Sequence, residues 1–149
     1  MEARMKSVAN PDVTTAIQHL FKAVHAGGVD LRVLELVHLR AGQINGFSAC
    51  VYAGVASARK HGESDERLHG VVAWREAPFS SESERAALAL TEAATRIQDG
   101  APGVTDDIWD DVTAQFGRNE LSAIILNIAL TNFFNRINHT LREPAGTAW

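Results

Sequence analysis

ELVHLRAGQINGFSAC, residues 35–50, is the stretch that decides the expected fold of this 149-residue chain. It begins inside a segment, 31–44, that is apolar nearly all round, which predicts a central and buried helix. The dipeptide Asn45-Gly46 then predicts a sharp turn. A further helix is expected over about 47–61, so the two helices would form a hairpin.

The spacing of apolar side chains predicts helices in the rest of the chain as well. They are expected over 12–26, 65–74, 81 to about 97, 105–116 and 120 to about 141. No sustained alternation of apolar and polar residues predicts a strand. We therefore expect an all-α fold of about seven helices, arranged as a single domain over residues 1–149.

Three helix starts carry recognisable capping residues. Ser64 is expected to cap the helix that follows it. Ser81 and Glu84 have the spacing of a capping box, in which serine caps the helix and glutamate lies three residues later. Asn119 is expected to cap the long last helix. Gly62 is expected to end the helix before it.

Composition excludes several classes of protein. The net charge is −4 and no basic run occurs, which argues against nucleic-acid binding. The longest apolar stretch, 121–134, is too short to span a membrane. The N-terminus has no apolar signal-peptide segment, and a lone cysteine excludes an intrachain disulfide framework. These features predict a cytoplasmic protein with no nucleic-acid or membrane partner.

Cys50 is the only cysteine, and it lies near the start of a predicted helix. A helix N-terminus offers unpaired N–H groups and partial positive charge, which can lower the pKa of a thiol. A lone cysteine between Ala49 and Val51 is equally typical of a small buried apolar residue. Both interpretations are open at this point.

Glu35 lies in the middle of the apolar segment, and His38 follows on the same helical face. A carboxylate there requires a partner, a proton or a function. Glu35 and His38 could pair with each other or with Arg32 and Arg40 at a surface. Alternatively, the predicted hairpin brings them beside Cys50 as a general acid and base.

The last predicted helix carries a polar stripe on an otherwise apolar sequence, formed by Asn127, Thr131, Asn135 and Asn138. The stripe could face a pocket, or it could hold neighbouring helices together. No group of residues has the spacing of a metal site, because His19 and His25 lie six apart. No glycine-rich phosphate loop occurs, so the sequence predicts neither a metal nor a cofactor.

Residues 35–50 also resemble a known family. Four further segments share the resemblance, namely 59–62 (RKHG), 74–80 (WREAPFS), 84–93 (ERAALALTEA) and Asn135-Arg136. This combination is similar to the alkylhydroperoxidase D and carboxymuconolactone decarboxylase family (AhpD-like). The similarity spans most of a core at 11–142. It implies an AhpD-like helical domain that forms a homo-oligomer, as a dimer, trimer or hexamer. The apolar second and last helices could supply an isologous interface.

The resemblance implies a catalytic site for which this chain retains half of the residues. Peroxidases of the family use a C-x-x-C pair, a glutamate and a histidine, and pass through a sulfenic acid and a disulfide. The second cysteine corresponds to Cys50 and the glutamate to Glu35. The first cysteine corresponds to Phe47 and the histidine to Gly54, so two of the four positions are replaced. Whether the protein is an enzyme therefore stays open.

Three functional hypotheses follow from the resemblance. The first is a one-cysteine alkylhydroperoxidase, an antioxidant oxidoreductase with peroxiredoxin-like activity. Cys50 would react with a peroxide, an external thiol would reduce it, and Glu35 and His38 would transfer protons. The second is a carboxymuconolactone decarboxylase-like pocket that binds a small lactone or carbonyl compound without cysteine chemistry. Glu35 and His38 would line it with Phe47, Tyr52 and Gly54. The third is a non-catalytic oligomeric protein.

Overall fold

The structure is a computed structural model, and it describes residues 2–5, 7–97 and 102–146. These residues form seven α-helices and one 3₁₀ turn, and no strand occurs among them. The elements are α1 (Pro11–His25), α2 (Leu31–Ile44), α3 (Ser48–Lys60), α4 (Asp65–Gly70), the turn η1 (Val71–Ala73), α5 (Glu82–Thr95), α6 (Asp106–Gln115) and α7 (Arg118–Leu141). The expected all-α class is confirmed.

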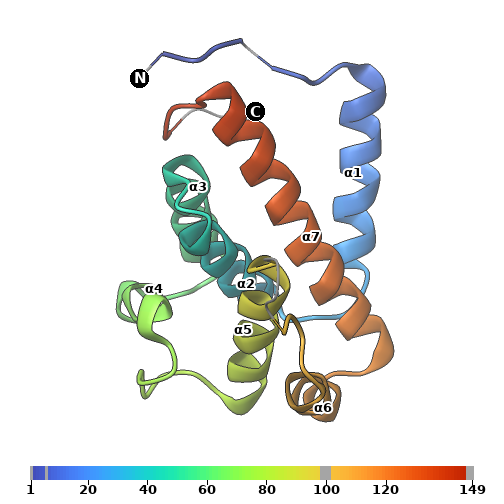
Figure 1. Cartoon of the computed structure of the whole chain (residues 1–149), viewed down its shortest axis with the longest axis vertical. Helices are drawn as coiled ribbons and strands as arrows, with labels where there is room; N and C mark the ends of the chain where they lie inside the picture. Colours follow the sequence, from blue (N-terminus) through green and yellow to red (C-terminus); the bar gives the residue numbers. More distant parts are fainter. Residues whose placement is uncertain (1, 6, 98–101, 147–149) are drawn as a thin grey trace.

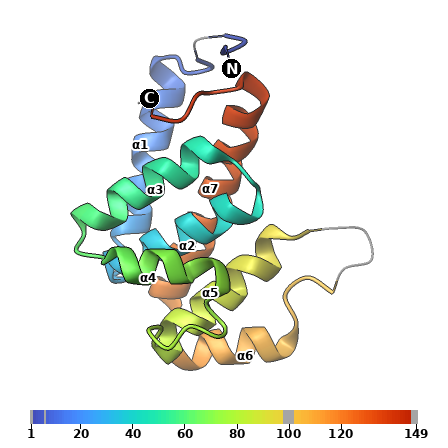
Figure 2. The same ribbon diagram turned by 90° about the vertical axis from the view of Figure 1, so that its left-hand side faces the viewer.

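Helix α2 is the centre of the fold, as its apolar sequence predicts. It packs against α3, α5 and α7 (Figures 1 and 2). Its buried residues are Val33, Leu34, Leu36, Val37, Leu39, Arg40, Ala41 and Gly42. Helices α5 and α6 lie at the end of the molecule opposite the two chain termini. The protomer's own core uses most of the apolar surface of α2, although Leu31 is 41% exposed. The isologous interface expected from the second and last helices stays a prediction.

The predicted hairpin between α2 and α3 is present. The chain turns at Gly46, whose φ of +64° is a left-handed conformation that glycine adopts without strain. Gly42 faces α3 in this hairpin, and a Cβ atom at this position would make an ordinary contact, 3.6 Å from the Cys50 Cβ. The hairpin brings α3 into contact with α2 from Glu35 to Gly42.

Most of the predicted helix ends are confirmed. Ser64 accepts a hydrogen bond from the Arg67 N–H, and Ser81 and Glu84 form the full capping box. Gly62 follows α3 with a φ of +92°. The expected cap at Asn119 is wrong, because α7 begins at Arg118, two residues before the expected start at Glu120.

The actual N-cap of α7 is Gly117. Its backbone N–H donates to Glu120 Oε2 at 2.8 Å, so the glutamate side chain satisfies the N-cap amide. Asn119 consequently lies inside the first turn of α7.

A buried carboxylate fixes α5 against α2 and the segment after η1. Glu92 is 3% exposed and accepts hydrogen bonds from Arg40 Nε at 2.8 Å and Trp74 Nε1 at 2.9 Å. Despite the cost of burial, these donors and the Arg40 charge lower the pKa of Glu92 to about 2. The carboxylate is therefore ionised and fully engaged in holding the helices together.

Helix α1 buries only one of its 15 residues. It packs against α7, and Val24 is its one buried residue, while Leu20 and Phe21 are exposed. An amphipathic helix normally turns its apolar face to the core. None of the helices in the described residues is long and apolar enough to cross a lipid bilayer.

Candidate functional site

The centre of the candidate site is the carboxylate of Glu35, which projects from the middle of α2. Its Oε1 atom accepts a hydrogen bond from Ser57 Oγ at 2.6 Å and lies 3.0 Å from His61 Nδ1, with which it forms an ion pair when the imidazole is protonated. Ser57 and His61 lie four residues apart at the end of α3, so their side chains share a helical face. Glu35 is largely buried and His61 is about one-third exposed, with side-chain exposures of 15% and 35%.

These contacts correct the surface pairing that the sequence left open. Arg40 binds Glu92 in the core, with a shortest N–O distance of 2.6 Å. Arg32 binds Asp30 at 3.0 Å, beside the start of its own helix. Neither arginine reaches Glu35, because the partners of this carboxylate come from α3.

His38 lies one helical turn beyond Glu35 and points toward α7. Its Nδ1 is 3.2 Å from Thr131 Oγ1. Burial lowers the pKa of His38, although the negative charge of Glu35 and a hydrogen bond to the Cys50 backbone oppose this effect. His38 is thus a neutral imidazole at neutral pH, placed between the glutamate and the backbone that carries the cysteine.

Gly54 provides the space that the His38 ring occupies. A Cβ atom at Gly54 would lie 2.9 Å from His38 Cδ2, which is closer than real side chains approach. Gly54 is also the position that matches the family's histidine in α3. The family resemblance predicts a histidine of α3 at position 54. In this chain the imidazole of His38, from α2, packs against that position instead.

Cys50 is buried, with 6% exposure, and its sulfur faces α7. The Asn138 amide donates to Sγ at 3.8 Å. Burial raises the pKa of the Cys50 thiol, and the amides of Asn138 and Asn135 only partly oppose this rise. The position near the start of α3 therefore does not give an activated thiolate.

A cavity of about 290 Å³ lies beside Glu35, between α1, α2, α3 and α7. We call it the Glu35 cavity. Its lining residues are Phe21, His25, Leu34, Glu35, His38, Ala53, Ser57, His61, Asn127, Leu130, Thr131 and Phe134. Its volume is at the lower end of the range for small-molecule sites, and its walls combine apolar and acid–base groups.

The structure brings only some of the predicted site residues to this cavity. Glu35 and His38 line it, whereas Cys50 does not. Phe47 packs with Ala49 and Cys50, and Tyr52 is 62% exposed. Both were expected to line the pocket with Glu35, and neither does. Gly54 acts through the room it leaves and does not line the cavity either.

The polar stripe on α7 holds neighbouring segments through side-chain hydrogen bonds. Asn127 Nδ2 donates to Leu34 O at 2.9 Å, and Asn135 Oδ1 accepts from Asn45 Nδ2 at 2.6 Å. Two members, Asn127 and Thr131, also reach the cavity wall. Both interpretations of the stripe therefore hold, at different positions along the helix.

Ser57, His61 and His25 are cavity residues that the sequence did not single out as functional. A signal for two of them exists, because Cys50, Gly54, Ser57 and His61 recur at intervals of three or four residues. His25 carries no such signal, since its place depends on how α1 docks. Within the described residues, no cluster of three or more His, Cys, Asp or Glu side chains is arranged to hold a metal ion.

The fold and the residues of the hairpin define a protein of the AhpD-like helical class. The sequence profile of the carboxymuconolactone decarboxylase family matches residues 11–93, more than half of the chain. The chain belongs to this family.

Two relatives are uncharacterized bacterial proteins. YdfG of Bacillus subtilis is 29% identical over 137 residues, which is 92% of each protein. YnjA of Escherichia coli is 32% identical over 118 residues, which is 78% of this chain and 63% of YnjA.

Solved structures confirm the AhpD-like fold. One is a protein of unknown function from Agrobacterium tumefaciens, suggested to be the antioxidant defence protein AhpD. It is 30% identical, with a TM-score of 0.88 over 99% of this chain and 100% of that one. The debrominase Bmp8 is 21% identical, with a TM-score of 0.81 over 93% of this chain and 73% of Bmp8. The second likeness concerns the fold alone.

Proposed function

We propose that this protein is an acid–base enzyme that acts on a small lactone or related carbonyl compound without using its cysteine. One observation carries the proposal. The Glu35 carboxylate binds Ser57 and His61 on the wall of a cavity that can hold a small molecule. The family's description as carboxymuconolactone decarboxylases supports this class of substrate.

His61 is the proposed general base. Its Nδ1 lies 3.0 Å from Glu35 Oε1, so the carboxylate favours a neutral ring with the hydrogen on Nδ1 and with Nε2 as the proton acceptor. Nε2 removes a proton from the carbon next to the substrate carbonyl, and Glu35 stabilises the resulting imidazolium. The same proton then returns at the far end of the conjugated enolate, so that the double bond of an unsaturated lactone moves and no group leaves.

Ser57 and His38 have supporting roles in this proposal. The Ser57 hydroxyl donates to Glu35 Oε1 and so fixes the carboxylate that orients His61. His38 lines the same cavity as a neutral ring, held in place by Thr131 and by the Cys50 backbone. The apolar walls formed by Phe21, Leu34 and Leu130 exclude water from a small apolar substrate.

The location of Cys50 favours this proposal over the cysteine-based hypothesis. The thiol does not line the cavity, and burial raises its pKa. The nucleophilic form of a cysteine is the thiolate, so a raised pKa lowers the reactive fraction at neutral pH.

The test is isomerisation of a panel of unsaturated lactones and β,γ-unsaturated ketones by matched variants. Glu35→Gln should lower kcat at least 100-fold, because it removes the negative charge that supports the imidazolium. Cys50→Ser should retain turnover and binding. Glu66→Gln, an exposed carboxylate on α4, is the control and should behave as wild type. Loss of turnover in Cys50→Ser, or full activity in Glu35→Gln, would overturn the proposal.

A second candidate, the one-cysteine peroxidase, is supported by the two asparagine amides that face the sulfur. A Cys50 thiolate would attack a hydroperoxide oxygen, the alcohol would leave, and a sulfenic acid would form. An external thiol would then reduce it through a mixed disulfide and release water. Hydroperoxides with a dithiol reductant therefore belong in the same panel, where Cys50→Ser would abolish their turnover. A wild type inactive on every compound would favour the non-catalytic hypothesis.

A further inference from the structure

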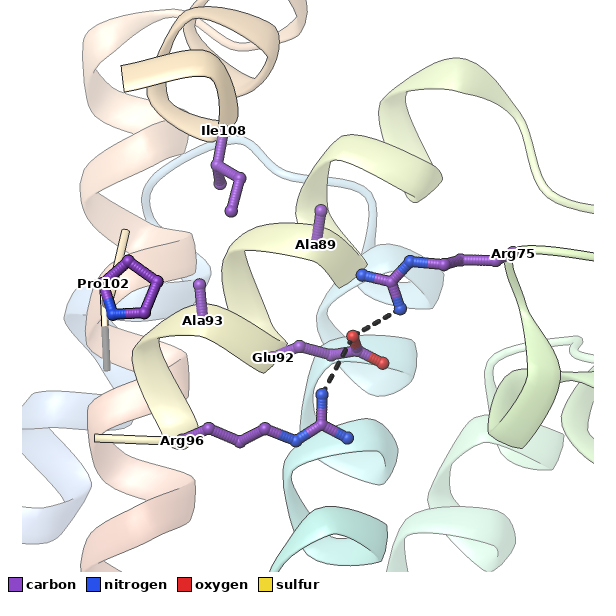
Figure 3. A pocket seen from close by; sticks show the side chains of 8 residues that line it. Arg75, Ala89, Glu92, Ala93, Arg96, Pro102 and Ile108 are labelled. Atoms are coloured by element: carbon purple, nitrogen blue, oxygen red, sulfur yellow. Dashed lines mark hydrogen bonds and ion pairs between the residues drawn. The ribbon is translucent and has the colours of Figure 1, made fainter. Parts of the chain in front are cut away.

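A second cavity, of about 300 Å³, lies between α5, α6 and the segment that follows η1. We call it the arginine cavity. Helix α5 contributes Ala89, Glu92, Ala93 and Arg96, and the other walls come from Arg75, Pro102, Gly103 and Ile108 (Figure 3). It shares no described lining residue with the Glu35 cavity, so it is a separate site.

Two guanidinium groups meet at one carboxylate oxygen in the arginine cavity. Glu92 Oε2 accepts from Arg75 Nη1 at 2.5 Å and from Arg96 Nη1 at 3.2 Å. Figure 3 shows the two arginines approaching Glu92 from different directions, one from α5 and one from the segment after η1. The other carboxylate oxygen, Oε1, is occupied by Arg40 and Trp74. Glu92 is therefore saturated and has no acceptor capacity to spare.

The arginines have charge and donors beyond what Glu92 uses. Three guanidinium groups, of Arg40, Arg75 and Arg96, surround one carboxylate, which leaves an excess of two positive charges among these four groups. Each guanidinium carries five N–H donors. Arg75 and Arg96 each contact Glu92 through Nη1, and their side chains are 60% and 49% exposed.

The position of Arg75 is fixed by its contacts. Its guanidinium carbon lies 4.3 Å from the centroid of the Trp74 ring, in a cation–π arrangement. The Trp74 indole in turn donates to Glu92. A ligand that binds Arg75 therefore does not have to order this side chain first, which favours binding.

The wall beside the arginines is apolar. Ala89 and Ala93 lie one turn apart on α5, and Ile108 faces them from α6 (Figure 3). Such a surface suits a compact aliphatic or aromatic group, whereas a free inorganic anion would leave it exposed to water.

We propose that the arginine cavity binds a small organic monocarboxylate with an apolar body. The ligand carboxylate accepts hydrogen bonds from the guanidinium groups of Arg75 and Arg96, which are strong because both partners are charged. Its apolar body lies on Ala89, Ala93 and Ile108. The excess positive charge offsets the repulsion between the ligand and Glu92.

The test is a titration with benzoate followed through the Trp74 indole N–H in ¹H–¹⁵N spectra, assigned with Trp74→Phe. This N–H donates to Glu92 and lies beneath Arg75, so binding at the arginines should shift its resonance. Benzoate should give a saturable shift at constant ionic strength. Acetate, which has the same charge and a minimal body, should bind at least tenfold more weakly. Equal effects of benzoate, acetate and chloride would mean charge screening and would overturn the proposal.

Matched arginine variants locate the site. Arg96→Gln should weaken benzoate binding about tenfold, whereas Arg118→Gln, an exposed arginine at the start of α7, should leave it unchanged. If Arg96→Gln folds poorly, Ile108→Asp provides the second variant, since it leaves every Glu92 contact in place. It introduces a negative charge into the cavity and should abolish benzoate binding. Unchanged affinity in a folded Arg96→Gln or Ile108→Asp variant would contradict the assignment.

Discussion

The absence of a side chain at Gly54 determines where the His38 ring lies. Its hydrogen in place of a Cβ lets the His38 ring pack against α3, where it also bonds Thr131 of α7. The sequence presents the replacement of a histidine by Gly54 as the loss of a base. In the folded chain, an imidazole from α2 packs at the same place. The pairing of positions 38 and 54 follows from the packing of two helices, so spacing along one helix does not reveal it.

Gly54→Ala should therefore displace the His38 ring. The added Cβ would lie 2.9 Å from Cδ2, and relief of this overlap should cost about 1–3 kcal/mol of the free energy of unfolding. Urea denaturation measures that cost, and the His38 ring resonances report the displacement.

Gly70→Ala is the control, because a Cβ there makes ordinary contacts at 3.5 and 3.8 Å. It should change stability by less than about 1 kcal/mol. An unchanged His38 signal in a stable Gly54→Ala protein would show that the ring does not depend on the glycine.

At the scale of helices, α7 links the candidate site to the core. Asn127, Thr131 and Asn135 occupy one face of α7 and bond α2 or the turn after it. The sequence alone identified this stripe through helical periodicity, since every member lies on the same helix. It did not identify the partners, because Leu34 and Asn127 are 93 residues apart.

A comparison of Thr131 with Thr91 distinguishes an effect on the candidate site from an effect on stability alone. Both are buried, and both donate to the carbonyl four residues earlier, at 2.8 Å and 2.7 Å. Of the two, Thr131 is the one that also bonds His38. Thr131→Val and Thr91→Val should each cost about 1 kcal/mol of unfolding free energy.

Only Thr131→Val should alter the His38 ring resonances and lower turnover of the proposed substrate. Thermal denaturation compares the stabilities, and ¹⁵N spectra of the histidine ring compare the tautomers. Identical His38 spectra in the two variants would exclude a positioning role for Thr131.

The difference between local patterns and contacts between helices explains which parts of the site could be predicted from the sequence. Glu35 stands out because a carboxylate within an apolar helix demands a partner, and the structure gives it two. His61 stands in the sequence only as part of the segment RKHG that carries the family resemblance. Its contact with Glu35 joins the end of α3 to α2, and no local pattern reveals such a contact. Local patterns predict helices and their caps, whereas contacts between helices depend on how the chain packs.

At the scale of the whole molecule, α1 is the helix whose apolar face the protomer leaves partly uncovered. Leu20 is 41% exposed and Phe21 37%, although both belong to the apolar pattern that predicts this helix. Phe21 also stacks on Phe134 of α7 and lines the Glu35 cavity. We propose that a second copy of the chain covers this face; the interface that the sequence predicts on the second and last helices is the alternative.

Leu20→Asp should therefore shift the protein toward a monomer. Light scattering after gel filtration should give the wild type a mass that is a multiple of 16.1 kDa, and the variant should elute at or near the single-chain mass. A charge buried in an apolar interface without a partner is strongly unfavourable, so one substitution is enough to weaken assembly. Val72→Asp is the control, because Val72 is 62% exposed on the turn η1, away from α1. A monomeric wild type at high concentration, or equal masses for Leu20→Asp and wild type, would exclude α1 as the interface. If assembly is lost while Glu35-dependent turnover persists, the cavity functions within a single chain.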